Sequence, residues 1–151
     1  MILLKRSTSE DVDFIKLIKE LDQDLAHKNG DNNEFFVQFN KIDLIKNVVI
    51  IYENDIAVGC GAFKKYCDES IEIKRMFVDP SARNKGFATA ILRELTNWAK
   101  ELNYSTAILE TGDKMTEAIH LYQKEGFTLT PNYPPYDNEP TSKCFKKNLL
   151  N

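Results

Sequence analysis

Hydrophobic and polar positions along this chain alternate with a period of two in some segments and of three to four in others. The β-branched run Val48–Glu53, a turn at Asn54-Asp55 and the segment Ile56–Tyr66 together predict a hairpin. A second turn leads into Ser70–Val78, so these three strands are expected to form an antiparallel meander. Four further strands are predicted at Ile2–Arg6, Thr106–Glu110, Phe127–Thr130 and Lys143–Lys147.

Helical spacing predicts a first helix with Thr8 as its cap and Asp11 closing a capping box. This helix should end near Ala26, where the polar segment His27–Asn33 predicts a loop, and a short helix could follow at Glu34–Asn40. The apolar face of the first helix would be formed by Phe14, Leu17, Ile18, Leu21 and Leu25.

Two more helices are predicted in the second half of the chain, one from about Lys85 to Leu102 and one over Thr116–Glu125 that stops at Gly126. The segment Pro131–Pro140 is expected to be a loop. Together the elements predict an α/β (α+β) fold with one mixed sheet of about seven strands and about four helices. The buried stripe of the longer helix would consist of Ala88, Ile91, Leu92, Leu95, Trp98 and Leu102.

Composition limits the classes of protein and partner. A length of 151 residues favours a single domain over residues 1–151, and 42% hydrophobic with 28% charged residues argues against disorder. The net charge of −3 argues against nucleic acid as a partner, and the apolar runs are shorter than the ~20 residues of a membrane span. Three cysteines without metal-like spacing and only two histidines favour a reduced, cytoplasmic protein without a metal site.

The segment from Glu72 to Ala88 is the most informative for chemistry, because a strand is followed by a short loop and a glycine-bearing helix start. Gly86 and Ala88 keep this loop free of bulky side chains. Backbone N–H groups, the positive end of the helix and the side chains of Arg83 and Lys85 would all favour a phosphate group. The alternative is a solvated helix start with no ligand.

The spacing Arg83-x-x-Gly86-x-Ala88 resembles the (Gln/Arg)-x-x-Gly-x-(Gly/Ala) signature of the GNAT superfamily of N-acetyltransferases. A second block, from Ala118 through Leu121-Tyr122 to Gly126-Phe127, is similar to that family's A-x-x-L-Y-x-x-x-G-F motif. The similarity covers roughly residues 48–130, and the chain resembles the small bacterial members of the family.

The resemblance implies a GNAT-like acyl-CoA N-acyltransferase fold and acetyl-CoA as the acyl donor. The acetyl-CoA pyrophosphate would lie on the backbone amides of the loop and helix start, formed by Arg83, Asn84, Lys85, Gly86, Phe87, Ala88 and Thr89. The pantetheine arm would pair with the strand at Met76, Phe77 and Val78, where the backbone N–H of Phe77 or Val78 would polarise the thioester carbonyl. One customary cofactor contact is missing, because Met115 stands where the family often has Asn.

Tyr122 occupies the family's frequent general-acid position, although its ring could instead serve only to pack the helix onto the sheet. Glu72 and Glu110 are the two carboxylates expected near the cleft, where either could deprotonate an amine or hold its ammonium group. The implied reaction is direct acetyl transfer to a primary amine on a small molecule or peptide. The alternatives are a non-catalytic acyl-CoA sensor and a nucleotide-binding α/β domain, and a homodimer is left open.

Other features have structural explanations at this stage. Gly59-Cys60-Gly61 lies within a predicted strand and lacks the rest of a dinucleotide fingerprint. His120 is expected on a helix surface, and Cys60 and Cys144 are expected in the core. Two aromatic segments are undecided between site and structure, namely Phe35, Phe36 and Phe39, and the loop Tyr133–Tyr136.

Overall fold

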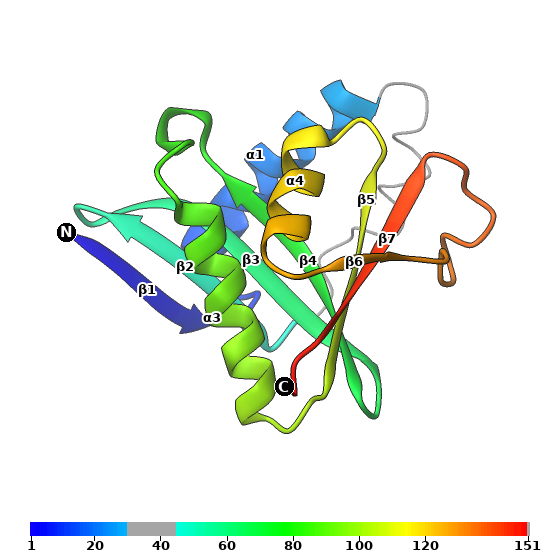
Figure 1. Cartoon of the computed structure of the whole chain (residues 1–151). Helices are drawn as coiled ribbons and strands as arrows, with labels where there is room; N and C mark the ends of the chain where they lie inside the picture. The colour runs from blue at the N-terminus through cyan, green and yellow to red at the C-terminus, as the bar shows by residue number, and fades with distance from the viewer. Residues whose placement is uncertain (30–44, 151) are drawn as a thin grey trace.

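The computed structural model describes residues 1–29 and 45–150, and within them seven strands form one mixed sheet in the order β1-β2-β3-β4-β5-β7-β6 (Figure 1). The predicted strands are all present, with ends that differ by a few residues. Their bounds are β1 Ile2–Ser7, β2 Asn47–Glu53, β3 Ile56–Cys67, β4 Ser70–Val78, β5 Thr106–Gly112, β6 Thr128–Thr130 and β7 Ser142–Asn148. The helices are α1 Val12–Asn29, the 3-10 turn η2 Pro80–Ala82, α3 Phe87–Glu101 and α4 Thr116–Lys124.

The mixed fold is as expected, with three α-helices in the described residues rather than about four. The expected helix at Glu34–Asn40 lies outside the described residues. Strands β1 to β4 are antiparallel, which confirms the meander, and β4 pairs with β5 in parallel. Strand β7 lies antiparallel between β5 and β6. No helix among the described residues combines the length and hydropathy that crossing a bilayer requires.

The cap predicted for the first helix was wrong. Helix α1 begins at Val12, and the Asp11 carboxylate accepts a 2.9 Å hydrogen bond from the backbone N–H of Asp13. Asp11 is thus the capping residue, because its side chain reaches the free N–H groups of the first turn. Thr8 lies before this turn, where its carbonyl accepts from the Asp11 N–H at 3.1 Å. The helix also continues past Ala26 to Asn29, so the start of the loop predicted at His27 was wrong.

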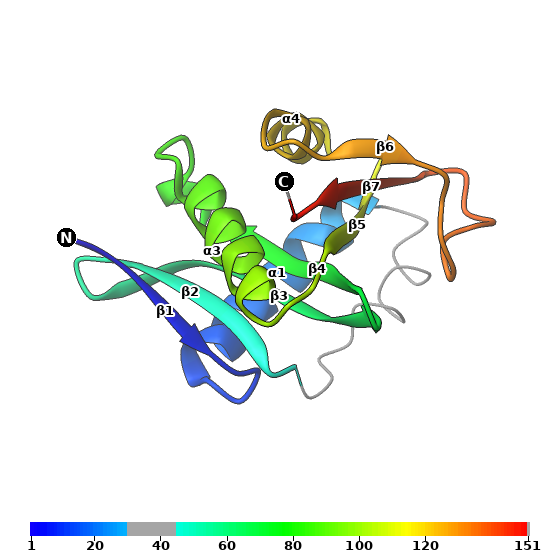
Figure 2. The same cartoon turned by 60° about the horizontal axis from the view of Figure 1, so that its bottom comes forward.

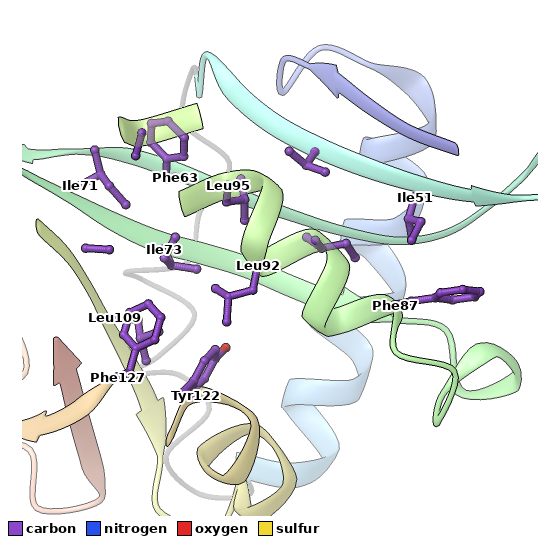
Figure 3. Packing of buried hydrophobic residues seen from close by; sticks show 14 of the residues in the cluster. Ile51, Phe63, Ile71, Ile73, Phe87, Leu92, Leu95, Leu109, Tyr122 and Phe127 are labelled. Atoms are coloured by element: carbon purple, nitrogen blue, oxygen red, sulfur yellow. The ribbon is translucent and has the colours of Figure 1, made fainter. Parts of the chain in front are cut away.

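The two faces of the sheet are covered by different helices, as Figures 1 and 2 show. Helix α1 lies on one face, and α3 and α4 lie on the other. The core on the α3 side is shown in Figure 3, and its fully buried side chains include Phe63, Ile91, Leu95 and Leu109. Leu102 was wrongly assigned to this core, because α3 ends at Glu101 and Leu102 is 48% exposed.

Two glycines of β3 allow α3 to approach the sheet closely. A Cβ on Gly61 would lie 2.6 Å from Sδ of Met76 and 2.8 Å from Cγ2 of Ile91. A Cβ on Gly59 would lie 3.1 Å from Cδ1 of Ile91 on α3 and 3.0 Å from the carbonyl oxygen of Phe77. These glycines are therefore packing positions in a strand, as the sequence indicated.

Strand β4 separates from β5 after its first three residues. The two strands pair only from Ser70 to Glu72, and Figure 1 shows them diverging beyond that point. A register shift against β3 accompanies this divergence, and Arg75 at the shift has a φ of 62°. One extra residue in β4 therefore forms a bulge that bends the strand, and β4 has no pairing to β5 after Glu72.

Candidate active site

Two adjoining cavities open where β4 parts from β5. The larger has a volume of about 600 Å³ and lies between the end of β4, the start of α3, and α4. The smaller, of about 110 Å³, lies between β4, β5 and α1. Both are lined by Leu21, Met76, Met115, Ala118 and Tyr122. The two cavities therefore adjoin at these five residues, where a ligand in the larger cavity can contact a ligand in the smaller one.

The larger cavity brings together nine of the ten residues expected to contact acetyl-CoA. The exception is Lys85, whose Nζ lies 3.2 Å from Oε1 of Glu53 on β2. The nine that line the cavity are Met76, Phe77, Val78, Arg83, Asn84, Gly86, Phe87, Ala88 and Thr89.

The start of α3 provides a concave site for an anion. Gly86 has a φ of 81° and precedes the first helical residue, with no side chain capping the helix. The first N–H groups of an α-helix have no intrahelical partner and carry the positive end of the helix dipole. A Cβ on Gly86 would meet no heavy atom within 4 Å, so the space beside this loop is open. These features fit the pyrophosphate of acetyl-CoA.

The Arg83 side chain is held by the protein beside this loop. Its Nε donates a 2.8 Å hydrogen bond to the carbonyl oxygen of Val78, and its Nη2 lies 3.6 Å from Oδ2 of Asp24. The guanidinium also lies over the Phe77 ring, at 5.8 Å from the centroid. Arg83 thus fixes the end of β4 against the loop, in addition to placing positive charge at the cavity.

The directions of the backbone N–H groups on β4 distinguish Phe77 from Val78 as the hydrogen-bond donor to the thioester carbonyl. Neighbouring N–H groups of a strand point to opposite edges. The backbone N–H of Asp79 donates a 2.8 Å hydrogen bond to the carbonyl oxygen of Val58 on β3. The N–H of Val78 therefore lies on the other edge, which faces the gap between β4 and β5, whereas the N–H of Phe77 faces β3.

Glu72 and Glu110 both line the smaller cavity, on either side of the divergence. Glu72 is buried, and its Oε2 accepts a 2.8 Å hydrogen bond from the phenol of Tyr133. Oε2 of Glu110 accepts a 2.7 Å hydrogen bond from the hydroxyl of Ser142. Burial raises the pKa of Glu110 to about 7, against the opposing effect of Ser142. Glu110 can therefore gain and lose a proton near neutral pH.

Tyr122 combines the two roles considered for it. Its ring is buried, with centroids 6.0 Å from Phe127 and 6.4 Å from Phe145. Its hydroxyl has no hydrogen-bond partner among the described residues and points away from Phe127 in Figure 3. Because Tyr122 lines both cavities, this hydroxyl is available to a ligand at their junction. Burial raises the pKa of the phenol, which keeps it protonated.

The loop after β6 closes one side of the smaller cavity and contains residues that the sequence did not assign. The Asn132 Nδ2 donates to three carbonyl oxygens, those of Tyr136, Glu139 and Ser142, and so fixes the loop. Tyr136 is buried and lines the cavity, and Tyr133 contacts Glu72.

Lys74 also lines the smaller cavity and was not predicted from the sequence. Its position two residues after Glu72 on a strand indicates that the two side chains share one face of the sheet. His120 is exposed and lines neither cavity, and Cys60 and Cys144 are buried. Within the described residues, no group of three or more His, Cys, Asp or Glu side chains is arranged to hold a metal ion.

Comparisons with known proteins agree with this geometry. Residues 45–129 match the model of the acetyltransferase (GNAT) domain family. The chain is 30% identical to the IAA acetyltransferase of Azospirillum brasilense over 139 residues, covering 89% of this chain and 90% of that protein. A Klebsiella pneumoniae structure, provisionally assigned as an acyl-CoA N-acyltransferase, superposes with a TM-score of 0.82 at 28% identity, covering 99% of both chains.

A GNAT family acetyltransferase from Elizabethkingia anophelis, solved with acetyl-CoA bound, has a TM-score of 0.70 at 21% identity and covers 97% of both chains. This likeness shows the shared fold. The family match and the Azospirillum relative carry the assignment further, to acetyl-CoA-dependent acyl transfer. This chain belongs to the GNAT family of N-acetyltransferases.

Proposed function

We propose that this protein transfers the acetyl group of acetyl-CoA to the primary amine of a small acceptor, by direct attack with both molecules bound. The observation that carries the proposal is the junction of the two cavities at Met76 and Tyr122. Binding two reactants side by side converts a bimolecular reaction into one within a single complex, which lowers the entropic part of the barrier.

The donor side of the site would use backbone groups. Gly86 and the first turn of α3 would hold the pyrophosphate. When bound, acetyl-CoA supplies an acetyl thioester, whose C–S bond is exchanged for a C–N bond to the acceptor with release of the CoA thiol. The N–H of Val78 would donate a hydrogen bond to the thioester carbonyl oxygen, on which negative charge develops. The family resemblance left Phe77 and Val78 as alternatives for this donor. The backbone N–H of Val78 faces the gap between β4 and β5, which supports Val78.

Side chains at the acceptor cavity would transfer the protons. An alkylammonium with a pKa near ~10.4 must lose a proton before its nitrogen can attack. Glu110, with its pKa raised to about 7 by burial, would accept this proton near neutral pH. Glu72 would hold the ammonium or act as the alternative base. The hydroxyl of Tyr122 would donate its proton to the departing sulphur.

The proposal is tested by incubating the protein with acetyl-CoA and a panel of amines and measuring free thiol, with the acetylated products identified by mass spectrometry. Amine-dependent thiol release is the expected result. IAA is tested alongside the amines, because the Azospirillum relative is named for it. Thermal stabilisation by acetyl-CoA without thiol release would favour the sensor alternative, and stabilisation by ATP or NAD but not CoA would favour a nucleotide-binding domain.

A further inference from the structure

Strand β1 forms one edge of the sheet, and its first half is apolar and exposed. Among the described residues it pairs only with β2, and Figures 1 and 2 show it at the border of the molecule. Ile2, Leu3 and Leu4 are 48%, 53% and 36% exposed. Because an edge strand can pair with a strand of another chain, proteins usually protect it with a proline, a bulge or a projecting charge.

Strand β1 has neither a proline nor a bulge, and its charges are compensated within the chain. Its register against β2 is unbroken along its whole length. Nζ of Lys5 lies 2.8 Å from Oδ2 of Asp11, and Nε of Arg6 lies 2.7 Å from Oε2 of Glu94. These ion pairs weaken the repulsion that the two cations would exert on a second strand at this edge.

Alternate residues of β1 present their backbone groups to the open edge. The N–H of Asn54 donates a 2.9 Å hydrogen bond to the carbonyl oxygen of Met1, so these two residues form a bonded pair between β1 and β2. Bonded and non-bonded pairs alternate along an antiparallel ladder. The N–H and carbonyl groups of Ile2, Leu4 and Arg6 therefore point away from β2 and toward the open edge.

A second copy of β1 matches this edge in one antiparallel register. With Leu4 opposite Leu4 of the second copy, Ile2 lies opposite Arg6, and all three outward residues of each strand form bonded pairs. The same register places Lys5 opposite Leu3, so no cation faces a cation. A shift by two residues in one direction would place Lys5 opposite Lys5, which destabilises a sheet, and a shift in the other direction would leave Arg6 unpaired.

We propose that two copies of this chain associate through β1, with a two-fold axis at Leu4 that joins the two sheets into one. Arg6 lies over the Trp98 ring of α3, at 4.9 Å from the centroid, so Ile2 and Leu4 share its face of the sheet. Four apolar side chains, Ile2 and Leu4 from each copy, would thus form the centre on the α3 side. An apolar centre with a polar rim is the usual arrangement of a protein interface.

The association leaves the active site open. Among the described residues, those that line the two cavities come from outside β1 and β2. The cavities lie beyond β4, on the other side of the sheet from the proposed axis in the strand order. Each copy would therefore keep a complete and separate site.

The mass of the wild-type chain in solution tests the proposal. Sedimentation velocity at about 100 μM should give a dimer, because a Kd of micromolar order leaves few monomers at that concentration. The expected mass is twice 17.4 kDa. A wild-type monomer would overturn the proposal and would leave the edge of β1 to a strand of another protein.

Lysine substitutions on the two edge strands locate the interface. Leu4→Lys would place a charge at the axis, opposite the same charge in the second copy, and should give a monomer whose circular dichroism matches that of the wild type. Leu129→Lys is the matched control, because Leu129 is 64% exposed on β6 at the opposite edge of the sheet, and it should stay dimeric. A dimer with Leu4→Lys, or a monomer with Leu129→Lys, would overturn the assignment to β1.

Two further variants test the backbone pairing and its register. Leu4→Pro removes an N–H that points away from β2, so β1 should keep its pairing with β2 while the dimer is lost. Leu4→Cys should form a disulfide between copies on mild oxidation, because bonded partners have Cα atoms about 5.5 Å apart. Leu129→Cys should not, and both are made with Cys67→Ser because Cys67 is exposed. A dimer in which Leu4→Cys does not cross-link would contradict the register.

Discussion

Tyr133 donates a 2.8 Å hydrogen bond from its phenol to Oε2 of Glu72, and so joins the loop after β6 to the point where β4 leaves β5. The contact links residues that are 61 positions apart in the chain. A buried carboxylate needs donors to replace water, and here a tyrosine supplies one that stays protonated because burial and the Glu72 charge raise its pKa.

Tyr133→Phe should destabilise the protein, because Glu72 would keep its burial and lose this donor. Hydrogen bonds to charged groups contribute about 1.5–3 kcal/mol, so unfolding by heat should occur some 3–10 °C lower. Tyr66→Phe is the control, since its hydroxyl makes only an exposed 3.4 Å contact with the carbonyl oxygen of Pro134. Equal melting temperatures for the two variants would show that the Glu72 contact contributes little.

Glu110→Gln should change how stability depends on pH. Burial raises the pKa of Glu110 from an ordinary 4.5 to about 7, so the folded protein retains a proton that the unfolded chain releases. The free energy of unfolding of the wild type therefore falls as the pH rises from about 4.5 to about 7, and glutamine lacks this penalty. The variant should exceed the wild type by at most about 3 kcal/mol at pH 8 and match it at pH 4.

Denaturant titrations at several pH values measure this difference. Ser142→Ala provides a second variant, because loss of the hydroxyl that donates to Glu110 should extend the fall to a higher pH. Curves for Glu110→Gln and the wild type that run parallel from pH 4 to pH 8 would contradict the raised pKa.

Local patterns were sufficient to predict the sheet and to bring together in one cavity most of the residues proposed to bind acetyl-CoA. The loop from Arg83 to Ala88 is continuous in sequence, so its glycine and the following helix form the proposed anion site without distant contacts. The helix cap shows the limit of such patterns. Thr8 and Asp11 both suit the position, and only the tertiary path decides that Asp11 reaches the Asp13 N–H.

The acceptor half could be predicted only in part, because its residues come from distant segments. Glu72 was expected from the family resemblance and Glu110 from the end of a strand, but Tyr133 depends on how the eleven-residue loop between β6 and β7 folds back over the sheet. The bulge at Arg75 carries no glycine to mark it, and it determines which face Lys74 and Arg75 share. Patterns of alternation cannot locate such an extra residue.

Gly86→Asp should weaken binding of acetyl-CoA by roughly tenfold or more, because a carboxylate would occupy the anion site at the start of α3. The variant should still fold, since a Cβ at Gly86 has open space around it, although its φ of 81° costs a side chain about 1 kcal/mol. Gly86→Asn is the matched control, because asparagine tolerates this φ and adds similar bulk without charge. Calorimetric titration with CoA measures the affinity of both variants. Normal binding by Gly86→Asp would show that this loop does not bind the pyrophosphate.

Tyr122→Phe separates catalysis from packing more cleanly than most substitutions. The ring contacts with Phe127 and Phe145 remain, and the lost hydroxyl has no hydrogen-bond partner among the described residues, so stability should not fall. If this hydroxyl protonates the departing thiolate, kcat should fall by about 10²-fold or more while KM for acetyl-CoA stays the same. Tyr104→Phe, remote from both cavities, is the control. An unchanged kcat would leave Tyr122 as a packing residue alone, and the proton would then have to reach the sulphur from water.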